Sequence, residues 1–426
     1  MKTPPADYVI RMVDSPLAID AAAWNGLLAL QNQSVSGNDP KASAVGNPFM
    51  RHEYLCAMDQ SGSATPETGW TPRFFTLWQG TTLAAACALY LKTHSYGEYV
   101  FDHAWANAYR QHGMAYYPKA LIAAPFTPVP GPRLLAVSDT ARQALVAALL
   151  QWCQEAEIPS LHLLFGMPED IAACEQAGLL LRQTVQFHWT NRQPEPWRDF
   201  DDFLHSLNQE KRKKIRQERR KVADAGIAFR WARGVDISQA DWDFFYRCYE
   251  RTYLEHGNAP YLSRDFFARM ASDMPENWLL FVGEYEGQPV ASSLIALCAD
   301  VSCPNSSFDV ENKALSPASP VPPSQGGVAY GRYWGALARV DCLHFEACYY
   351  QPLAWCIAHG FARFEGGAQG EHKMARALLP VATHSAHWLA HPQFSEAISR
   401  YLAREADGIE DYQAHLAERN PFKTLV

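Results

Sequence analysis

The chain has 426 residues, of which 48% are hydrophobic and 12% aromatic. This composition supports large cores and excludes an intrinsically disordered protein, and the length favours two domains over one. A net charge of -8 at pH 7 argues against a general nucleic-acid-binding protein, whose domains tend to be basic.

The ten cysteines are scattered through apolar stretches, without a Cys-x-x-Cys pair or a Cys/His cluster at zinc-binding spacing. We expect free thiols in a reducing compartment and no metal. The N-terminal stretch "MKTPPADYVIRMVD" has no apolar core of a signal peptide. The longest apolar runs are shorter than the roughly 20 residues of a membrane helix. The sequence therefore predicts a cytoplasmic protein.

Segments of the first half recur in the same order in the second half, which predicts an internal duplication. The first pair is "PFMRHEYLCAM" (48–58) and "PYLSRDFFARM" (260–270), which share a proline, aromatic positions, an acidic residue and a final methionine. The second pair covers 74–91 and 281–297. Each of these two segments reads as two strands joined by a glycine turn, which predicts a β-hairpin.

Two further pairs follow in the same order. The third is "YGEY" (96–99) and "YGRY" (330–333), both interpreted as strands. The fourth is "LLFG" (163–166) and "ARFEGG" (362–367), each at the end of a strand-like run, with a His-Trp pair at the same distance beyond the phenylalanine. The second copy adds "GGAQGEHK" where the first has a single glycine, which favours the second copy as the working site.

Each copy is expected to contain helix, β-hairpin, strand, helix, strand, helix and strand. Amphipathic helices are predicted at 140–156 and 345–359, each before a strand. Alternating helices and strands predict two α/β domains, 1–195 and 196–426. A stretch at about 300–326, rich in Ser, Pro, Asn and Gly, is expected to be a mobile surface insertion.

A dense basic stretch, "KRKKIRQERRKV" (211–222), stands out in this acidic chain. It is compatible with a helix that has one apolar stripe, and Glu218 is its one acidic residue. Like charges one helical turn apart repel, so a run of cations this dense is unfavourable without an anionic partner. The stretch therefore indicates phosphate, RNA or an anionic precursor nearby. The alternative is a solvated helix face between two domains. The residues expected to bind the anion or tRNA are Lys211, Lys213, Lys214, Arg216, Arg219 and Arg220.

Acidic and histidine side chains gather in two stretches of the second half, "CLHFEACYY" and "FEGGAQGEHK". Both flank predicted neighbouring strands, whose ends border the crevice of an α/β sheet. Glu365 ends a strand and could act as a base there. Each residue alone could equally form a salt bridge or a helix cap. The catalytic candidates are Glu365, His344, Glu346, Glu371 and His372, and the substrate-binding candidates are Lys373, Arg376, Gly366, Gly367, Gly370, Tyr330 and Arg332.

The first half contains a polar and aromatic stretch, "KTHSYGEYVFDHAWANAYRQHG". This mixture is unusual for a plain strand and suits a groove that binds a sugar or a peptide. An interdomain contact surface would also explain it. The substrate-binding candidates in this stretch are His94, Tyr96, Glu98, Asp102 and Trp105.

The stretches "LKTHSYGEYVFDHAWANAY", "HFEACYYQPLAWCIAHG" and "GGAQGEHKMARALLP" resemble a bacterial family of N-acyltransferases that is called FemAB-like and concerned with peptidoglycan biosynthesis or recognition. The resemblance covers almost the whole chain except the insertion. It implies two tandem GNAT-like (acetyltransferase-type) domains, in agreement with the duplication. Fem enzymes transfer an amino acid from aminoacyl-tRNA to a peptidoglycan-precursor peptide, and similar basic helices begin their second domain.

One departure bears on the acyl donor. GNAT enzymes that use acetyl-CoA usually bind its phosphates with an Arg/Gln-x-x-Gly-x-Gly/Ala loop at a helix N-terminus. The corresponding place, after the strand in "YGRYWGALARVDCLHFE", has no such loop. The donor is therefore left open between acyl-CoA and aminoacyl-tRNA, with coenzyme A disfavoured.

The leading hypothesis is an N-acyltransferase that moves an acyl or aminoacyl group onto an amine, with a peptidoglycan-precursor peptide as the candidate acceptor. The second copy would carry the chemistry, and the cleft between the copies would bind the acceptor. Two alternatives stay open: a non-catalytic protein that recognises such precursors, and an acetyl-CoA-dependent GNAT with an atypical phosphate site.

Overall fold

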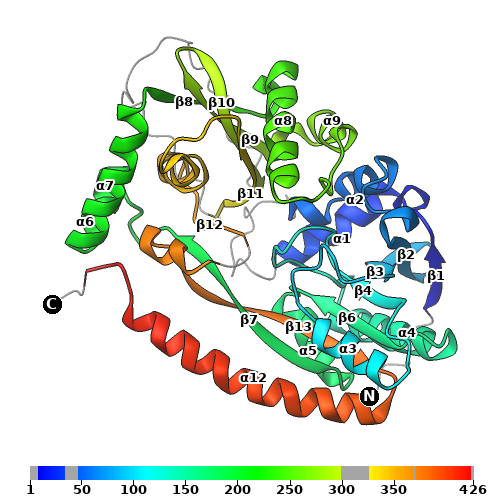
Figure 1. Cartoon of the computed structure of the whole chain (residues 1–426). Coiled ribbons are helices and arrows are strands. Elements are labelled where there is room, and N and C mark those ends of the chain that lie inside the picture. Colours follow the sequence, from blue (N-terminus) through cyan, green and yellow to red (C-terminus); the bar gives the residue numbers. More distant parts are fainter. Residues whose placement is uncertain (1–7, 34–46, 299–325, 368–369, 424–426) are drawn as a thin grey trace.

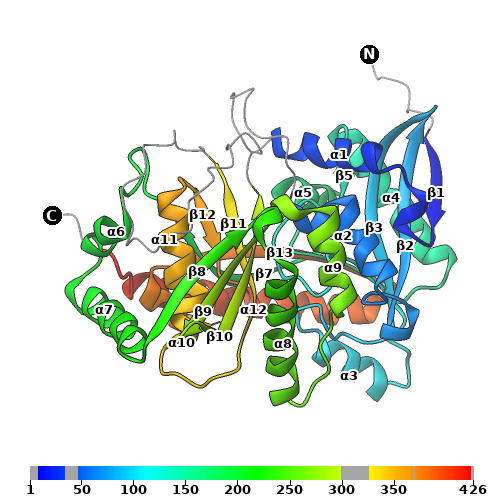
Figure 2. The same ribbon diagram turned by 90° about the horizontal axis from the view of Figure 1, so that it is seen from above.

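A single mixed sheet of 13 strands runs through the whole molecule (Figures 1 and 2). The computed structural model describes residues 8–33, 47–298, 326–367 and 370–423. The predicted insertion at about 300–326 lies outside these residues except for its last position. Along the sheet the strands follow the order β1-β2-β3-β4-β6-β13-β7-β12-β11-β10-β9-β8, and β5 pairs with β3.

The first half contains seven strands and five helices of regular α type among the described residues. They are β1 (Val9–Val13), α1 (Ala21–Gln33), α2 (His52–Gln60), β2 (Trp70–Gln79), β3 (Thr82–Lys92), α3 (His103–Gln111), β4 (Lys119–Ile122), β5 (Leu135–Ala136), α4 (Asp139–Glu155), β6 (Ser160–Leu164), α5 (Pro168–Gln176) and β7 (Leu180–Thr190). The predicted helix at 140–156 is α4, which Ser138 caps by accepting a hydrogen bond from Ala141 N–H.

The second half repeats the central part of this order, without counterparts of α3 and β5 and with α6, α7 and α12 added. Its elements are α6 (Phe200–Ser206), α7 (Gln209–Asp224), β8 (Ile227–Arg233), α8 (Gln239–Glu255), α9 (Arg264–Asp273), β9 (Trp278–Tyr285), β10 (Gln288–Cys298), β11 (Val328–Ala336), α10 (Leu343–Phe345), the π-helix η6 (Glu346–Tyr350), α11 (Gln351–Ala358), β12 (Arg363–Glu365), the 3-10 helix η7 (Glu371–Arg376), β13 (Leu379–Leu389) and α12 (Pro392–Glu418). The predicted helix at 345–359 comprises parts of α10, η6 and α11.

The last strand of each half lies inside the sheet of the other half. β13 pairs with β6 of the first half, β7 pairs with β12 of the second half, and β7 and β13 pair with each other. This central pairing is symmetric about Thr184 and Thr383, whose hydroxyl oxygens lie 2.8 Å apart. The two halves are therefore related by an approximate twofold axis between β7 and β13, which places the repeated His188 and His387 at equivalent positions.

The predicted hairpins are present. β2 and β3 form one, β9 and β10 form the other, and Gly80 and Gly287 turn them with φ values of +61° and +73°. The segments of the first repeated pair become α2 and α9, which pack against each other across the twofold axis through Tyr54 and Phe266.

Two sequence matches were wrong in detail. "YGEY" (96–99) lies in the loop between β3 and α3, and the strand equivalent to β11 is β4. β4 is buried on both faces, so it lacks the alternation that reveals a half-buried strand. The fourth pair was misaligned as well. Glu365 lies opposite His188, and the residue in the same position opposite His387 is His162.

Helices cover both faces of the sheet. On one face α1, α2, α8 and α9 from both halves share one apolar core, which includes Trp24, Tyr54, Phe245 and Phe267. On the other face α4 and α5 cover the first-half strands, and α6, α7 and α11 cover the second-half strands. The long helix α12 crosses beside β7 and β13 (Figure 1). In the part of the chain that the structure describes, no helix combines the length and apolarity needed to cross a membrane.

Candidate active site

Strands β11 and β12 diverge at one point in the second half. They run parallel for three residue pairs, the last of which is Tyr330 opposite Glu365. β11 then continues to Ala336 paired with β10 and no longer with β12. A β-bulge at Arg332 lies just beyond this point, because Gly331 and Tyr333 face consecutive residues of β10. Bulges bend a strand and redirect its side chains, and they are frequent beside active sites. Glu365 therefore ends its strand where the sheet opens.

In the first half, the corresponding space between the ends of β4 and β6 is filled by the segment that follows β4. The segment 123–134, which follows β4, donates the Gly131 N–H to Phe165 O at 3.0 Å and the Arg133 Nε–H to Leu164 O at 2.9 Å. These bonds join the segment to the end of β6. The two halves share a fold, but among the described residues only the second half shows this divergence without a bridging segment.

Glu365 is a buried carboxyl group that has no hydrogen bond in the part of the chain described here. Its side chain is 2% exposed, and neither carboxylate oxygen has a hydrogen-bond partner. Arg363 Nε approaches Oε1 at 3.0 Å, which is an ion pair without hydrogen-bond geometry, and His188 Nε2 lies 3.9 Å from Oε2. Burial raises the pKa of Glu365 to about 7, and the Arg363 guanidinium opposes that rise. Such a pKa suits a group that accepts a proton near neutral pH.

His188 beside it is a neutral imidazole. Burial, together with the nearby Arg363 and Lys373, lowers the pKa of His188 to about 3. Gln186 donates an amide N–H to Pro128 O at 2.7 Å, so its carbonyl oxygen faces His188 Nε2 at 3.2 Å. This arrangement assigns the proton of the ring to Nε2. The sequence predicted His188 only as a structural feature repeated with the fold. In the structure it is an uncharged neighbour of the Glu365 carboxyl group.

The glycine-rich segment after β12 brings one cation to the same place. Gly367 has φ +78°, a left-handed conformation that favours glycine. Its carbonyl oxygen accepts a hydrogen bond from Lys373 Nζ at 2.9 Å. Burial, with a contribution from Arg332, lowers the pKa of Lys373 to about 8. Of the predicted residues, the structure therefore brings Glu365, Lys373, Tyr330 and Arg332 together at the opening of the sheet.

The other acidic and histidine candidates have different surroundings. Glu371 is half exposed and pairs with Arg419 at 2.6 Å, and Glu346 is buried and pairs with Arg219 at 3.1 Å. His372 Nε2 lies 3.2 Å from the Tyr349 hydroxyl group. Two further predicted residues also lie away from Glu365. The His344 ring contacts the Trp334 ring, and Arg376 forms an ion pair with Glu218.

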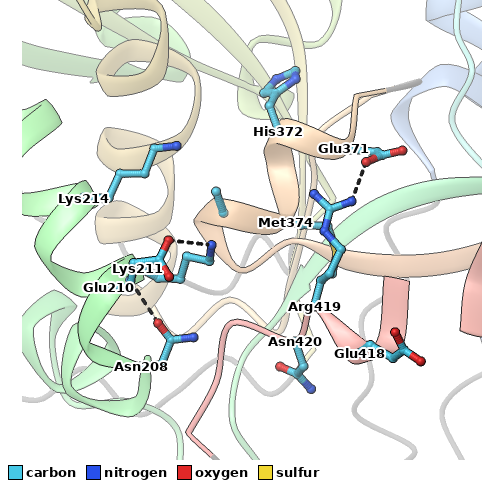
Figure 3. A pocket seen from close by; sticks show the side chains of 11 residues that line it. Asn208, Glu210, Lys211, Lys214, Glu371, His372, Met374, Glu418, Arg419 and Asn420 are labelled. Atoms are coloured by element: carbon cyan, nitrogen blue, oxygen red, sulfur yellow. Dashed lines mark hydrogen bonds and ion pairs between the residues drawn. The ribbon is translucent and has the colours of Figure 1, made fainter. Parts of the chain in front are cut away.

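A cavity of about 370 Å³ lies between α7, η7 and the C-terminal end of α12 (Figure 3). Two predicted catalytic residues and two predicted anion-binding residues line it, but Glu365 does not. The candidate base and this cavity are therefore separate places, and η7 is the element that borders both. The lining residues are Asn208, Glu210, Lys211, Lys214, Glu371, His372, Met374, Ala375, Glu418, Arg419 and Asn420.

An aromatic cradle surrounds Arg332 where the two halves meet. Arg332 donates an NH2 hydrogen to Phe126 O at 2.8 Å, and the Phe126 ring stacks on Tyr261 at a centroid distance of 4.8 Å. Tyr99 and Phe126 both have left-handed φ values, +63° and +55°. Non-glycine residues in this conformation are strained and cluster at functional sites. Phe126 and Tyr261 were missed, because nothing in their local sequence links two segments so far apart.

The polar stretch of the first half folds inward rather than forming an open groove. Glu98 and Asp102 are buried and both contact Lys119 Nζ, and Trp105 packs on His387 at a centroid distance of 5.0 Å. Of the other two candidates, His94 Nε2 lies 3.0 Å from Thr68 O, and Tyr96 is 65% exposed with its ring against His94. Lys119 and His162, the centre of this buried cluster, were not identified from the sequence.

The basic stretch is a helix, as predicted, and it divides into two faces. Ile215 and Val222 are buried, whereas Lys213, Lys214, Arg216 and Arg220 are exposed. The other two predicted anion-binding residues are partly buried: Arg219 pairs with Glu346, and Lys211 lines the cavity beside η7. Across the described ranges, no group of three or more His, Cys, Asp or Glu side chains is arranged to hold a metal ion.

Taken together, the duplicated sheet, the exchanged strands and the open parallel pair of β11 and β12 define a tandem α/β protein of GNAT-like architecture, as predicted. A family model called FemAB-like, described as peptidoglycan biosynthesis/recognition, matches residues 16–301 and 324–424. The chain belongs to this family. A search of curated proteins gave no significant match.

Three solved structures illustrate the similarity in fold. FemX is 8% identical with a TM-score of 0.49, over 91% of this chain and 100% of FemX. A tandem GNAT protein from the clavulanic acid biosynthesis pathway is 11% identical with a TM-score of 0.43, over 91% of this chain and 99% of its own. L-PGS from Bacillus licheniformis is 9% identical with a TM-score of 0.47, over 85% of this chain and 99% of its own.

Proposed function

We propose that the protein is an N-acyltransferase that moves an acyl or aminoacyl group onto an amine, with Glu365 as the general base. The observation that carries this proposal is the state of Glu365. It is a buried carboxyl group with a pKa of about 7, at the point where β11 and β12 part, and among the described residues it forms an ion pair with Arg363 but no hydrogen bond. We further propose that residues 1–195 and 196–426 are the two GNAT-like units, each of which lends its last strand to the other.

The proposed chemistry uses three groups of the second half. The acceptor amine attacks the acyl carbonyl carbon, a C–N bond forms, and the carboxylate of Glu365 takes the proton that the amine loses. Lys373 is the candidate to stabilise the negative charge that develops on the carbonyl oxygen. The intermediate then expels the carrier, which leaves with the electron pair of the broken bond. His188 Nε2 lies 3.9 Å from Glu365 Oε2, and its neutral ring adds no second positive charge beside the carboxylate.

The acceptor is proposed to bind in the aromatic cradle between the halves. Tyr99 and Tyr261 offer flat apolar faces. Arg332 lies over the Tyr99 ring, 5.9 Å from its centroid, and offers a cation whose Nε–H has no hydrogen-bond partner among the described residues. Such a combination suits a peptide or sugar that bears a negative charge. The family description supports a peptidoglycan precursor as that acceptor.

The donor is proposed to be an aminoacyl-tRNA or an acyl-CoA, and the exposed face of α7 is the candidate contact for tRNA. The double variant Lys213→Glu with Arg216→Glu should then weaken tRNA binding and flatten its salt dependence, because fewer phosphate charges are neutralised. Affinity measured at several salt concentrations tests this. Equal affinity and an equal salt slope in the variant and the wild type would rule out α7 as the contact.

Mass spectrometry of reactions with acetyl-CoA or with charged tRNA, each with a muramyl-peptide acceptor, tests the activity itself. Consumption of one donor with a matching mass increase of the acceptor is the expected result. The family description also names recognition, which favours one alternative: a protein that binds precursors without transferring anything to them. Tight precursor binding without turnover of either donor would establish that alternative and refute the enzyme proposal.

A further inference from the structure

The single acidic residue inside the basic stretch of α7 faces the interior of the protein. Glu218 is 8% exposed and shares its helix face with Ile215 and Val222, both of which are buried. Residues three or four positions apart lie on one face of a helix, so Glu218 occupies a position of the apolar stripe. A carboxylate at such a position needs partners, because a buried charge without them is strongly unfavourable.

Those partners come from η6, which lies between β11 and β12 in the chain, and from η7, which follows β12. Glu218 Oε2 accepts a hydrogen bond from Arg376 NH2 at 2.8 Å and another from the Tyr350 hydroxyl group of η6. Arg376 is 2% exposed, donates its NH1 to His372 O at 2.7 Å, and stacks over the Phe345 ring at 3.4 Å from the ring centroid. Glu218 and Arg376 thus form a buried tie between α7 and η7.

The segment that this tie holds has little regular structure of its own. η7 is a 3-10 helix of six residues, a form whose hydrogen bonds have poorer geometry than those of an α-helix. Glycines precede it, and glycine loses more conformational entropy on ordering than any other residue. The backbone bonds on either side of Lys373 are local, from Lys373 N–H to Gly370 O at 3.1 Å and from Leu378 N–H to Lys373 O at 3.2 Å. Its place in the molecule therefore depends on side chains such as Arg376.

We infer that Glu218 is a positioning residue that, through Arg376, fixes η7 and holds the Lys373 ammonium group beside Gly367 and the end of β12. The helix α7 then has two separate roles. Its outward cations form a charged surface, and its one inward carboxylate supports the site. The consequence for catalysis rests on the proposed function, whereas the consequence for the position of η7 does not.

Hydrogen exchange followed by mass spectrometry tests the tie without any substrate. In Glu218→Gln, the amides of 371–378 should exchange about ten-fold faster than in the wild type, because local opening loses a buried charged hydrogen bond. Exchange in β7 and β13 should not change. Asp224→Asn is the matched control: it removes the same charge from an exposed position of α7 and should exchange like the wild type. Glu218→Asp should restore part of the protection.

Two outcomes would overturn the inference: unchanged exchange at 371–378 in Glu218→Gln, or equal acceleration throughout the sheet, which would indicate general destabilisation. If Glu218→Gln does not fold, the same measurement on Arg376→Lys decides, since lysine keeps the charge but loses the planar fork. In a transfer assay, Glu218→Gln should lower kcat more than it changes the acceptor KM. A wild type without transfer activity would refute the proposed function and leave the exchange result standing.

Discussion

Replacing Glu365 with glutamine should reduce acyl transfer by about 10²- to 10⁴-fold, the range that general base catalysis contributes in enzymes. Glutamine keeps the shape of the side chain but cannot accept the proton of the attacking amine. The wild-type rate should rise as the pH passes through about 7, the pKa of Glu365, because only the carboxylate form is a base. The glutamine variant should lose this rise.

The same substitution should stabilise the protein at alkaline pH. Burial raises the folded-state pKa of Glu365 from its ordinary 4.5 to about 7, so the folded state binds more protons than the unfolded state between these values. Stability that depends on this group is therefore lost as the pH rises from about 4.5 to 7. Glu365→Gln does not carry this penalty, so it should be more stable than the wild type by roughly 2–4 kcal/mol at pH 8 and similar at pH 4.

Urea unfolding at pH 4, 6 and 8 checks this result, with Glu410→Gln on the exposed side of α12 as a matched control. The control removes the same charge from a solvated site and should not change the pH dependence. Full transfer activity in Glu365→Gln would exclude Glu365 as the base. If the unfolding free energies of Glu365→Gln and the wild type differed by the same amount at pH 4 and at pH 8, the Glu365 carboxyl group would not be desolvated.

Local patterns predicted much of this fold, because their physical causes are local. The glycine turns at Gly80 and Gly287 require positive φ values, which marks a hairpin in any context. The apolar stripe and the charges of α7 follow the helical period, and the structure confirms the helix. Glu365 was selected because it ends a strand, and β12 does end at Glu365.

The features that sequence reasoning missed depend on pairings between distant parts of the chain. β7 and β13 exchange places, yet their own sequences would suit either position in the sheet. β4 was overlooked because it is buried on both faces and short, while "YGEY" resembled a strand only through its likeness to "YGRY". His162 and Glu365 are equivalent by register although their surrounding sequences do not align, because strand pairing is made by backbone groups and does not require the same side chain at both positions.

The buried cluster of the first half gives the second large prediction. Lys119 Nζ contacts Glu98 Oε2 at 2.7 Å, Ser95 Oγ at 2.8 Å and Asp102, and the Lys119 side chain is 1% exposed. Burial alone would raise the pKa of Asp102, but the Lys119 ammonium holds that pKa well below its usual range. Lys119→Met removes this cation and leaves two buried carboxyl groups, those of Glu98 and Asp102, without their ammonium partner. The variant should therefore lose about 3–5 kcal/mol of unfolding free energy at pH 7.

The pH dependence of this loss separates a charge effect from a packing effect. In the wild type the lowered pKa of Asp102 contributes stability that is present above about pH 4 and is lost as the pH falls. In Lys119→Met the unpaired Asp102 takes up a proton more readily, so the difference between variant and wild type should shrink at acid pH. Adding Asp102→Asn should recover part of the stability at pH 7, because it removes the uncompensated charge. Lys423→Met, at an exposed position, should change nothing. A loss that is equal at pH 4 and pH 7 would assign Lys119 a packing role instead, and the first half would then hold its polar cluster by shape rather than by charge.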